Sequence, residues 1–391
     1  MLLLTVILMD LLTGMEFDLF VPSFHELQTY FHLTPFYVEA LLSSNFIGYC
    51  LSLFFVGSLS DRYGRKSMIL LGIGLFILGS IFCLWAVTYP MLLIGRFLQG
   101  VGIAAPSILS FLVIADAYAL KRQQYFMAML NAVMNTACAI APVIGSYVTL
   151  YFHWRGNFQL LLFIALFTAC MAIFFIPLRK LPEHKETPAL HGYFSLFQSK
   201  PLILLMVNIV CMFVPYWIFV GMSPLLYMKS LGVSLSHFGY YQGVLALIFA
   251  IGCVLFGFIM NRHSSKTMLK LSFKICIMSM LSVLWITLVN SKNPLQITIA
   301  FLPFIVSQII PSNILFPLCL NFIPEAKGKI SAILQAARLI FSALSLQLAG
   351  FFYQGTFQNI GWIISSFIII GIITQWYVMR NRHLLEQLEV K

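Results

Sequence analysis

Residues 57–66 of the chain read GSLSDRYGRK, and residues 257–266 read GFIMNRHSSK. Each stretch follows a long apolar run, and the two lie two hundred positions apart. The first Gly, the Arg and the final Lys coincide, whereas Asn261 replaces Asp61. A loop that recurs at this offset predicts a chain built from two repeated halves.

The composition is that of a membrane protein. Hydrophobic residues make up 61% of the 391 residues and charged residues only 9%, whereas a soluble domain has about 25% charged residues. Apolar runs of about 20 residues, long enough to span a bilayer as helices, recur along the chain. Barrel strands would be about half as long and would alternate. We count twelve runs, at 2–22, 36–59, 67–87, 91–115, 124–150, 156–177, 201–228, 237–260, 267–289, 295–319, 326–352 and 359–379.

These runs predict an all-α polytopic membrane protein with twelve transmembrane helices in two six-helix halves. The longest polar segment is rich in Pro, Lys and Glu and separates six runs from six. We therefore expect an N-terminal half at 1–177, a cytoplasmic linker at 178–200 and a C-terminal half at 201–391. Two repeated halves place a substrate site at their interface, near the membrane midplane.

The net charge of +11 follows from membrane topology and requires no nucleic-acid partner. With a cytoplasmic amino terminus, most basic residues fall on the cytoplasmic side, and only Arg155, Lys229 and Lys292 fall opposite. This bias predicts that both termini are cytoplasmic. The eight cysteines form no CxxC pair or Cys/His cluster, so we expect no disulfide framework and no metal site. No nucleophile–base pair or nucleotide-binding loop is present, so we expect neither an enzyme nor a cofactor.

Several motifs resemble those of the major facilitator superfamily. The loop of residues 57–66 resembles the superfamily's loop signature, and "GRFLQGVG" at 95–102 resembles its span-4 signature. "AIAPVIGS" at 139–146 resembles the span-5 signature of drug exporters, although Ala141 and Ser146 stand where glycine is common. "DLFVPSFHEL", from Asp18, resembles the opening of Bcr/CflA-type proton-coupled drug exporters, and Asp10 resembles an extra acid of MdfA-type transporters. The matching positions are Gly57, Asp61, Arg62, Gly64, Arg65 and Lys66 in the loop, Arg96, Gln99 and Gly100 in span 4, and Pro142 and Gly145 in span 5.

Span 1 contains three acids, Asp10, Glu16 and Asp18. Each costs about 2.5–3.5 kcal/mol at a helix centre, so the helix should lie within the bundle with its acids facing water or partners. On a regular helix Asp10 and Asp18 lie about 80° apart, and Glu16 projects about 200° away from Asp18. We expect Gly14 to leave open space between Asp10 and Asp18. Glu16 pairs with another helix or approaches the outer interface.

Arg96, inside span 4, is the expected counter-charge of Asp18, because either charge buried alone would be costly. A proton on Asp18 would then release Arg96, and its loss would restore the pair. The resemblance places the proton-coupling acid at Asp18; the alternative is a permanent structural ion pair. Asp10 either recognises cationic or polar substrates and takes part in proton coupling with Asp18, or it is only an acidic residue at the helix end.

Two further motifs have conformational roles. We expect Asp61 to meet a helix N-terminus or a neighbouring Arg and to lock one side closed; a solvated charge run is the alternative. Pro142 and Gly145 make either a bend or a tight contact against the facing half. Glu39, one turn after Thr34 and Pro35, is expected to gain from the helix dipole.

Span 11 carries a polar stripe of Ser331, Gln335, Arg338, Ser342 and Ser345. Arg338 either attracts a polar or anionic substrate or forms an ion pair with a span-1 or span-2 acid. Gln335 is a substrate-binding candidate with it. The remaining candidates are aromatic, namely Tyr216, Trp217, Tyr240 and Tyr241.

Together these features predict a secondary transporter that exports small, amphipathic organic compounds by alternating access, with protons as the coupling ion. The alternative is a dedicated exporter of one metabolite or siderophore, and an importer fits less well. The resemblance implies a monomer in the bacterial inner membrane, with the lipid bilayer as its other partner.

Overall fold

We analysed a computed structural model of the chain, which describes residues 1–118, 120–177, 199–260, 264–323 and 327–381. Within these ranges the chain is almost wholly helical and contains no β-strand. Most of the predicted linker, and the loop that repeats the motif around Asn261, therefore lie outside the described residues.

The chain divides into two compact units. The first comprises Met1–Ala189 with Ser234–Gly243, and the second comprises Leu190–Val233 with Val244–Lys391. The start of one helix from the second half of the sequence thus groups with the first unit, which the expected boundaries did not anticipate.

The first unit holds six long helices or helix arms, counting its opening helix and both arms of α6. Its elements are α1 (Leu2–Asp18), the 3-10 turn η1 (Val21–Ser23), α2 (Phe24–Tyr30), α3 (Pro35–Tyr63), α4 (Arg65–Leu84), α5 (Tyr89–Ala117) and α6 (Leu120–Phe175). The predicted first span ends early, at Asp18, because Pro22 has no N–H to continue the ladder and restricts the residue before it. Gly64 separates α3 from α4 at a φ of 89°, which glycine adopts at little cost.

α6 consists of two helices joined at His153, whose φ of 59° and ψ of −177° are not helical. The break falls between the runs predicted at 124–150 and 156–177. Ten described helices are long and apolar enough to cross a membrane. Counting both arms of α6, and α1 with its 17 residues, the described chain supplies the twelve spans that the hydropathy predicts.

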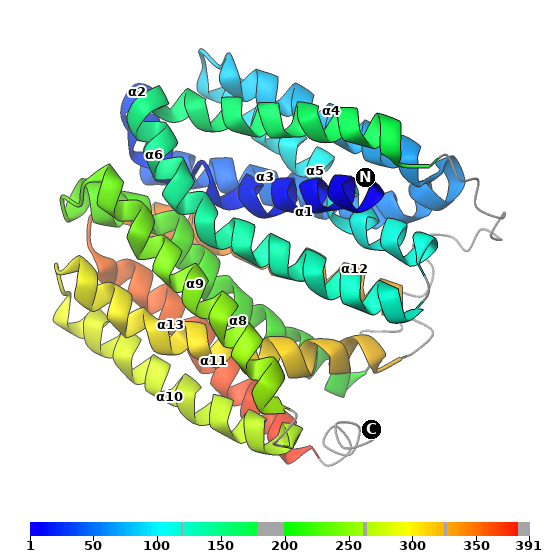
Figure 1. Cartoon of the computed structure of the whole chain (residues 1–391). Helices are drawn as coiled ribbons and strands as arrows, with labels where there is room; N and C mark the ends of the chain where they lie inside the picture. Colours follow the sequence, from blue (N-terminus) through cyan, green and yellow to red (C-terminus); the bar gives the residue numbers. More distant parts are fainter. Residues whose placement is uncertain (119, 178–198, 261–263, 324–326, 382–391) are drawn as a thin grey trace. The chain divides into compact units, whose positions relative to one another are not determined.

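In Figure 1, α1 lies along α6, and it packs against both α6 and α5. α5 also packs against α3 and α4, so it is the central helix of these contacts. Glycines permit the closest approaches: a Cβ added to Gly100 would collide with the backbone carbonyl of Asn45. This close approach brings the polar side chains of α3 and α5 to one level.

The second unit is also built from long helices, and most of its larger contacts join helices that are distant in sequence. Its elements are α8 (Lys200–Pro224), the π-helical turn η2 (Leu225–Ser230), α9 (Leu235–Met260), α10 (Ser265–Val289), α11 (Pro294–Asn321), α12 (Lys327–Phe352) and α13 (Phe357–Arg380). α8 packs against α11, α12 and α13, and α10 packs against α11 and α13. Phe219 and Phe301 stack at 4.3 Å in the core between α8 and α11.

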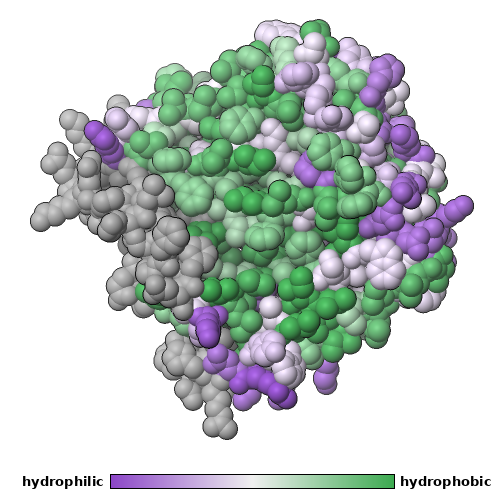
Figure 2. Space-filling model, turned by 180° about the vertical axis from the view of Figure 1, so that it is seen from behind, coloured by the Kyte–Doolittle hydropathy of each residue, from purple (hydrophilic) through white to green (hydrophobic). Residues whose placement is uncertain are grey.

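Hydrophobic side chains cover most of the coloured surface in Figure 2, and hydrophilic ones gather toward its margins. Phe163, Phe174 and Val254 are each more than 60% exposed. Exposed apolar surface on this scale marks contact with lipid or another protein, and here it coincides with bilayer-length helices. The chain is therefore a multi-pass membrane protein.

Candidate functional site

Two fully buried charged residues of the first unit, Glu16 and Arg96, meet at a junction of α1, α3 and α5. Arg96 donates from Nη1 to Glu16 Oε1 at 2.8 Å, and neither side chain has any exposed surface. The nitrogens Nε and Nη2 of Arg96 and the oxygen Oε2 of Glu16 have no hydrogen-bond partner. The pair is thus held through one nitrogen and one oxygen.

Neutral polar groups brace this ion pair from two further helices. Asn45 on α3 donates from Nδ2 to Glu16 Oε1 at 2.7 Å and to the carbonyl of Arg96 at 3.0 Å. Arg96 Nη1 also donates to Gln99 Oε1 at 2.6 Å, and Gln99 Nε2 donates to Ser80 Oγ on α4 at 2.8 Å. The network therefore links α1, α3, α4 and α5.

An aromatic ring completes the surroundings of the Arg96 guanidinium. Its carbon Cζ lies 3.9 Å from the centroid of the Phe20 ring, a distance suited to a cation–π contact. Phe20 in turn meets Phe24 and Phe158, with ring centroids 5.1 and 5.8 Å away. These rings keep one side of Arg96 dry, which strengthens its attraction to Glu16.

The expected pairing of Arg96 with Asp18 is wrong for this conformation. Arg96 binds Glu16, and Asp18, although 2% exposed, has no hydrogen-bond partner at Oδ1. The physical reason is helical phase: Asp18 and Glu16 project from nearly opposite sides of α1, and the Glu16 side faces α5. Of the two outcomes left open for Glu16, pairing with another helix is the one observed.

The Asp18 side of α1 faces α6. Gly14, one turn before Asp18, accepts a hydrogen bond at its carbonyl from Cys138 Sγ at 3.2 Å. A Cβ added to Gly14 would lie 2.6 Å from Met134 O and 2.8 Å from Ala137 Cβ. The expectation that Gly14 leaves open space is therefore wrong, because α6 fills that space.

Gly145, in the span-5 motif, lies against the residue that follows Asp18. A Cβ at Gly145 would collide with the carbonyl group of Leu19. The same stretch of α6 contacts α9 within this unit, because a Cβ on Gly239 would lie 2.9 Å from Pro142 O. The motif thus makes a tight contact on both sides, and its Leu19 contact is with span 1.

Asp10 is also fully buried, and neither of its carboxyl oxygens has a hydrogen-bond partner. Ser110 on α5 lies near it, but the Ser110 hydroxyl donates to the Ser107 carbonyl at 3.2 Å. Glu39 on α3 shares these features: it has no exposed surface, and both its oxygens lack partners. Because Glu39 lies in the second turn of α3, beyond its free N–H groups, the dipole does not account for its burial.

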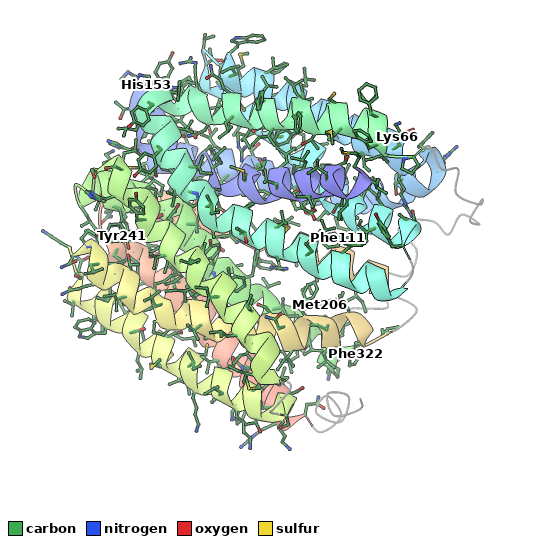
Figure 3. The ribbon with its side chains drawn as sticks, viewed as in Figure 1. Lys66, Phe111, His153, Met206, Tyr241 and Phe322 are labelled. Carbon is green, nitrogen blue, oxygen red and sulfur yellow. The ribbon has the colours of Figure 1, made fainter. Side chains whose placement is uncertain are left out.

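The motif loop sits at the opposite end of the first unit from His153, as the labelled Lys66 and His153 show in Figure 3. Arg65 donates from Nε to Asp116 Oδ2 on α5 at 3.3 Å and also contacts Ser60 Oγ. Lys66 Nζ donates to the carbonyl of Ile173 at 2.6 Å. The loop therefore ties α4 to the ends of α5 and α6. The Asp61 side chain lies outside the described residues.

In the second unit, Arg338 lies half-buried on α12. It donates from Nη1 to Gln335 Oε1 at 2.8 Å, and its Cζ lies 3.7 Å from the centroid of the Phe213 ring on α8. Ser342, one turn along, is fully buried, and its hydroxyl has no partner. Gln335 and Arg338 are thus brought together as expected.

The aromatic candidates separate into two groups. Tyr216 and Trp217 lie on α8 with ring centroids 5.7 Å apart, and Trp217 is only 8% exposed. Tyr240 on α9 is 49% exposed, and its hydroxyl lies 2.6 Å from that of Tyr147 within the first unit. Tyr241 is partly exposed (Figure 3). Tyr216 and Trp217 thus belong to the second unit, whereas Tyr240 and Tyr241 belong to the first.

Sequence reasoning missed three residues of these networks. Asn45 ends the short polar run of Ser43 and Ser44, and Ser80 is an isolated polar residue; polar side chains inside apolar spans were the available signal. Asp116 is an acid just before the basic residues Lys121 and Arg122, so it resembled part of a solvated loop. Its partner Arg65 lies fifty-one positions away, a distance that no local pattern covers.

Comparisons with known proteins agree with the fold and the motifs. A family model described as Major Facilitator Superfamily matches residues 6–346. The chain is 25% identical over 400 residues to a bicyclomycin resistance protein homolog of Haemophilus influenzae, covering 97% of this chain and 96% of that protein. It is 26% identical over 210 residues to multidrug resistance protein MdtL of Klebsiella pneumoniae, covering 51% of this chain and 52% of that protein.

Solved structures share the fold at low sequence identity. A bacterial homolog of the human lysosomal transporter Spinster, in an inward-facing unoccupied conformation, matches with a TM-score of 0.76 and 14% identity over 99% of this chain and 97% of that one. A D-xylose–proton symporter matches with a TM-score of 0.73 and 16% identity over 96% of each chain.

Proposed function

Because the chain belongs to the Major Facilitator Superfamily, we propose that it is a proton-coupled secondary transporter that exports small organic compounds by alternating access. Its relatives include proteins named for bicyclomycin and multidrug resistance, which supports drug efflux as its activity. It works as a monomer in a bacterial inner membrane, with both termini cytoplasmic.

The observation that carries this proposal is the pair of buried carboxyls on α1, at Asp10 and Asp18. Charges buried in a bilayer without partners are costly, and such residues mark proton and substrate pathways. A proton cancels the charge of either carboxyl, and ionisation restores it when the site opens to water. Asp18 is the proton-coupling residue, and Asp10 recognises the substrate and assists with proton transfer.

The other candidates have supporting roles. The loop from Gly57 to Lys66, through Arg65 and Asp116, controls closure at its end of the first unit. Gly145 fixes α6 against Leu19, just after α1, and Pro142 lies where α6 meets α9. Gln335, Arg338 and the four aromatic residues of the sequence analysis contact the substrate, which is amphipathic.

The second candidate function is a dedicated exporter of one metabolite. Its main support is that extra fixed charges in the membrane, at Glu16 and Arg338, would select particular ligands. Glu16 now has an internal partner in Arg96, so it does not select ligands. Arg338 alone favours this second function, because its half-buried guanidinium is a fixed cation in the membrane.

Everted membrane vesicles with an imposed proton gradient test the proposal. Vesicles with the wild-type chain should accumulate ethidium or another member of a panel of toxic compounds, and Asp18→Asn should fold but abolish gradient-driven accumulation. Uptake by the wild-type chain that persists after a protonophore collapses the gradient would refute proton coupling. Full activity of Asp18→Asn would remove Asp18 from the mechanism.

A further inference from the structure

We propose that Glu16 is the fixed counter-ion of Arg96, and that Asp18 binds and releases its proton without breaking this ion pair. The inference rests on the proposed function and specifies how the charges of α1 divide the work. Glu16 is then a positioning residue, and Asp18 alone changes charge during the cycle.

The first support is the burial of the Glu16–Arg96 pair. Both side chains are wholly buried, and one glutamate oxygen accepts from Arg96 at 2.8 Å and from Asn45 at 2.7 Å. Removing one partner of such a pair strongly destabilises a protein, because a bare charge remains buried. A switch that released Arg96 on each cycle would incur this cost at each turnover.

The second support is the direction in which each acid points. Glu16 faces α3 and α5, where its donors lie, whereas the Asp18 side of α1 faces α6. Bringing Asp18 to Arg96 would require α1 to rotate by about 160° about its axis. The close packing of Gly14 against Met134 and Ala137 opposes that rotation. Rotation would bring a residue with a side chain into a space that only glycine fits.

The third support is the electrostatic surroundings of Asp18. Its charged neighbour on α1 is Glu16, the titratable group facing it from α6 is the Cys138 thiol, and η1 carries no titratable side chain. Arg96, from α5, is bound on the far side of the helix to Glu16. Because Arg96 is bound to Glu16, it is not the salt-bridge partner of Asp18 in the described structure.

The pair also positions Asp18. Through Asn45 and Gln99 it fixes the rotation of α1 against α3, α4 and α5, so that Asp18 points toward α6. Leu19, the next residue, lies against Gly145. The acid is therefore held between a charged anchor on one side of α1 and the span-5 motif on the other.

Two measurements on the purified full-length protein test this inference. Infrared difference spectra across a pH titration report protonated carboxyls, and the component lost in Asp18→Asn is assigned to Asp18. In the double variant Glu16→Gln/Arg96→Met this component should remain, with its midpoint moved by less than about one pH unit, which corresponds to 1.36 kcal/mol. The midpoint of thermal unfolding should fall sharply in Glu16→Gln. The double variant should recover at least half of that fall.

The opposite results are equally defined. A shift of more than one unit in the double variant would mean that Arg96 is the partner of Asp18, and would overturn the inference. The inference would also be overturned if Glu16→Gln removed a second titrating carboxyl component, distinct from the one assigned to Asp18. Glu16 would then be a group that binds and releases a proton. If Glu16→Gln does not fold, the double variant alone still decides.

Glu39→Gln is the matched control. It makes the same glutamate-to-glutamine change at an equally buried position on α3, where neither carboxyl oxygen has a hydrogen-bond partner in the described structure. It should leave the Asp18 component unmoved. If the double variant loses proton-driven efflux but keeps the Asp18 component, the inference stands. If Asp18→Asn keeps both efflux and the titrating component, the proposed function is refuted instead.

Discussion

Asn45→Ala should destabilise the first unit measurably, although the residue carries no charge. The side chain makes two hydrogen bonds, to Glu16 Oε1 at 2.7 Å and to the carbonyl of Arg96 at 3.0 Å. A hydrogen bond to a charged group contributes about 1.5–3 kcal/mol in soluble proteins, and a neutral one about 0.5–1.5 kcal/mol. Between membrane helices the measured average is lower, about 0.6 kcal/mol with a maximum near 1.7.

We therefore expect a loss of about 1–2 kcal/mol, since one bond is charge-assisted and one neutral and both lie between membrane helices. For a unit of roughly two hundred residues this corresponds to about 2–8 °C in the unfolding midpoint. A thiol-reactive dye can follow unfolding, because five of the eight cysteines are buried in the folded protein. Ser44→Ala is the matched control: it removes one part-buried hydrogen bond, to Leu93 O at 3.2 Å.

The ordering of the two variants is the decisive result. Asn45→Ala should unfold clearly below Ser44→Ala, which should stay within about 2 °C of the wild-type chain. Equal midpoints for the two variants would show that Asn45 does not brace the ion pair, and the reasoning about the buried network would fail.

Gly145→Ala should lower the free energy of unfolding by about 1–3 kcal/mol and reduce proton-driven efflux, because the new Cβ would collide with the Leu19 carbonyl. Gly74→Ala is the control, since a Cβ there meets nothing within 4 Å. It should change neither the unfolding midpoint nor the transport rate. Asp116→Asn should cost no more than about 1 kcal/mol of stability, since the side chains of Arg65 and Asp116 are 14% and 31% exposed. The variant should nevertheless slow transport in vesicles while leaving ethidium binding to the purified protein unchanged. An Asp116→Asn protein that transports at the wild-type rate would exclude this pair from gating.

Hydropathy alone predicted most of the fold, because bilayer-length apolar runs can be satisfied only by helices. Where the predicted helix boundaries differ from the observed ones, the local sequence explains the difference. The run that begins at residue 2 is apolar beyond Asp18, but Pro22 ends the helix there. The break between the two arms of α6 was visible as a gap in hydropathy, although the left-handed backbone of His153 was not.

The site was harder to predict, because depth and helical phase do not identify which neighbour a side chain meets. Depth made Asp18 and Arg96 plausible partners, and phase correctly put Glu16 on the opposite side from Asp18. Only the packing of α1 reveals that the Glu16 side faces α5. Gly14 shows the same limit: a missing side chain reads as space in a sequence, whereas in the structure Met134 and Ala137 occupy it.

The hydrogen-bonded chain that runs from Asn45 through Glu16, Arg96 and Gln99 to Ser80 has a mechanical consequence. It crosses four helices at one level, so none of them can slide or turn alone without breaking a buried polar bond. α1, α3, α4 and α5 should therefore move as one rigid body, and the bending that opens and closes the pathway must fall on segments outside this clamp.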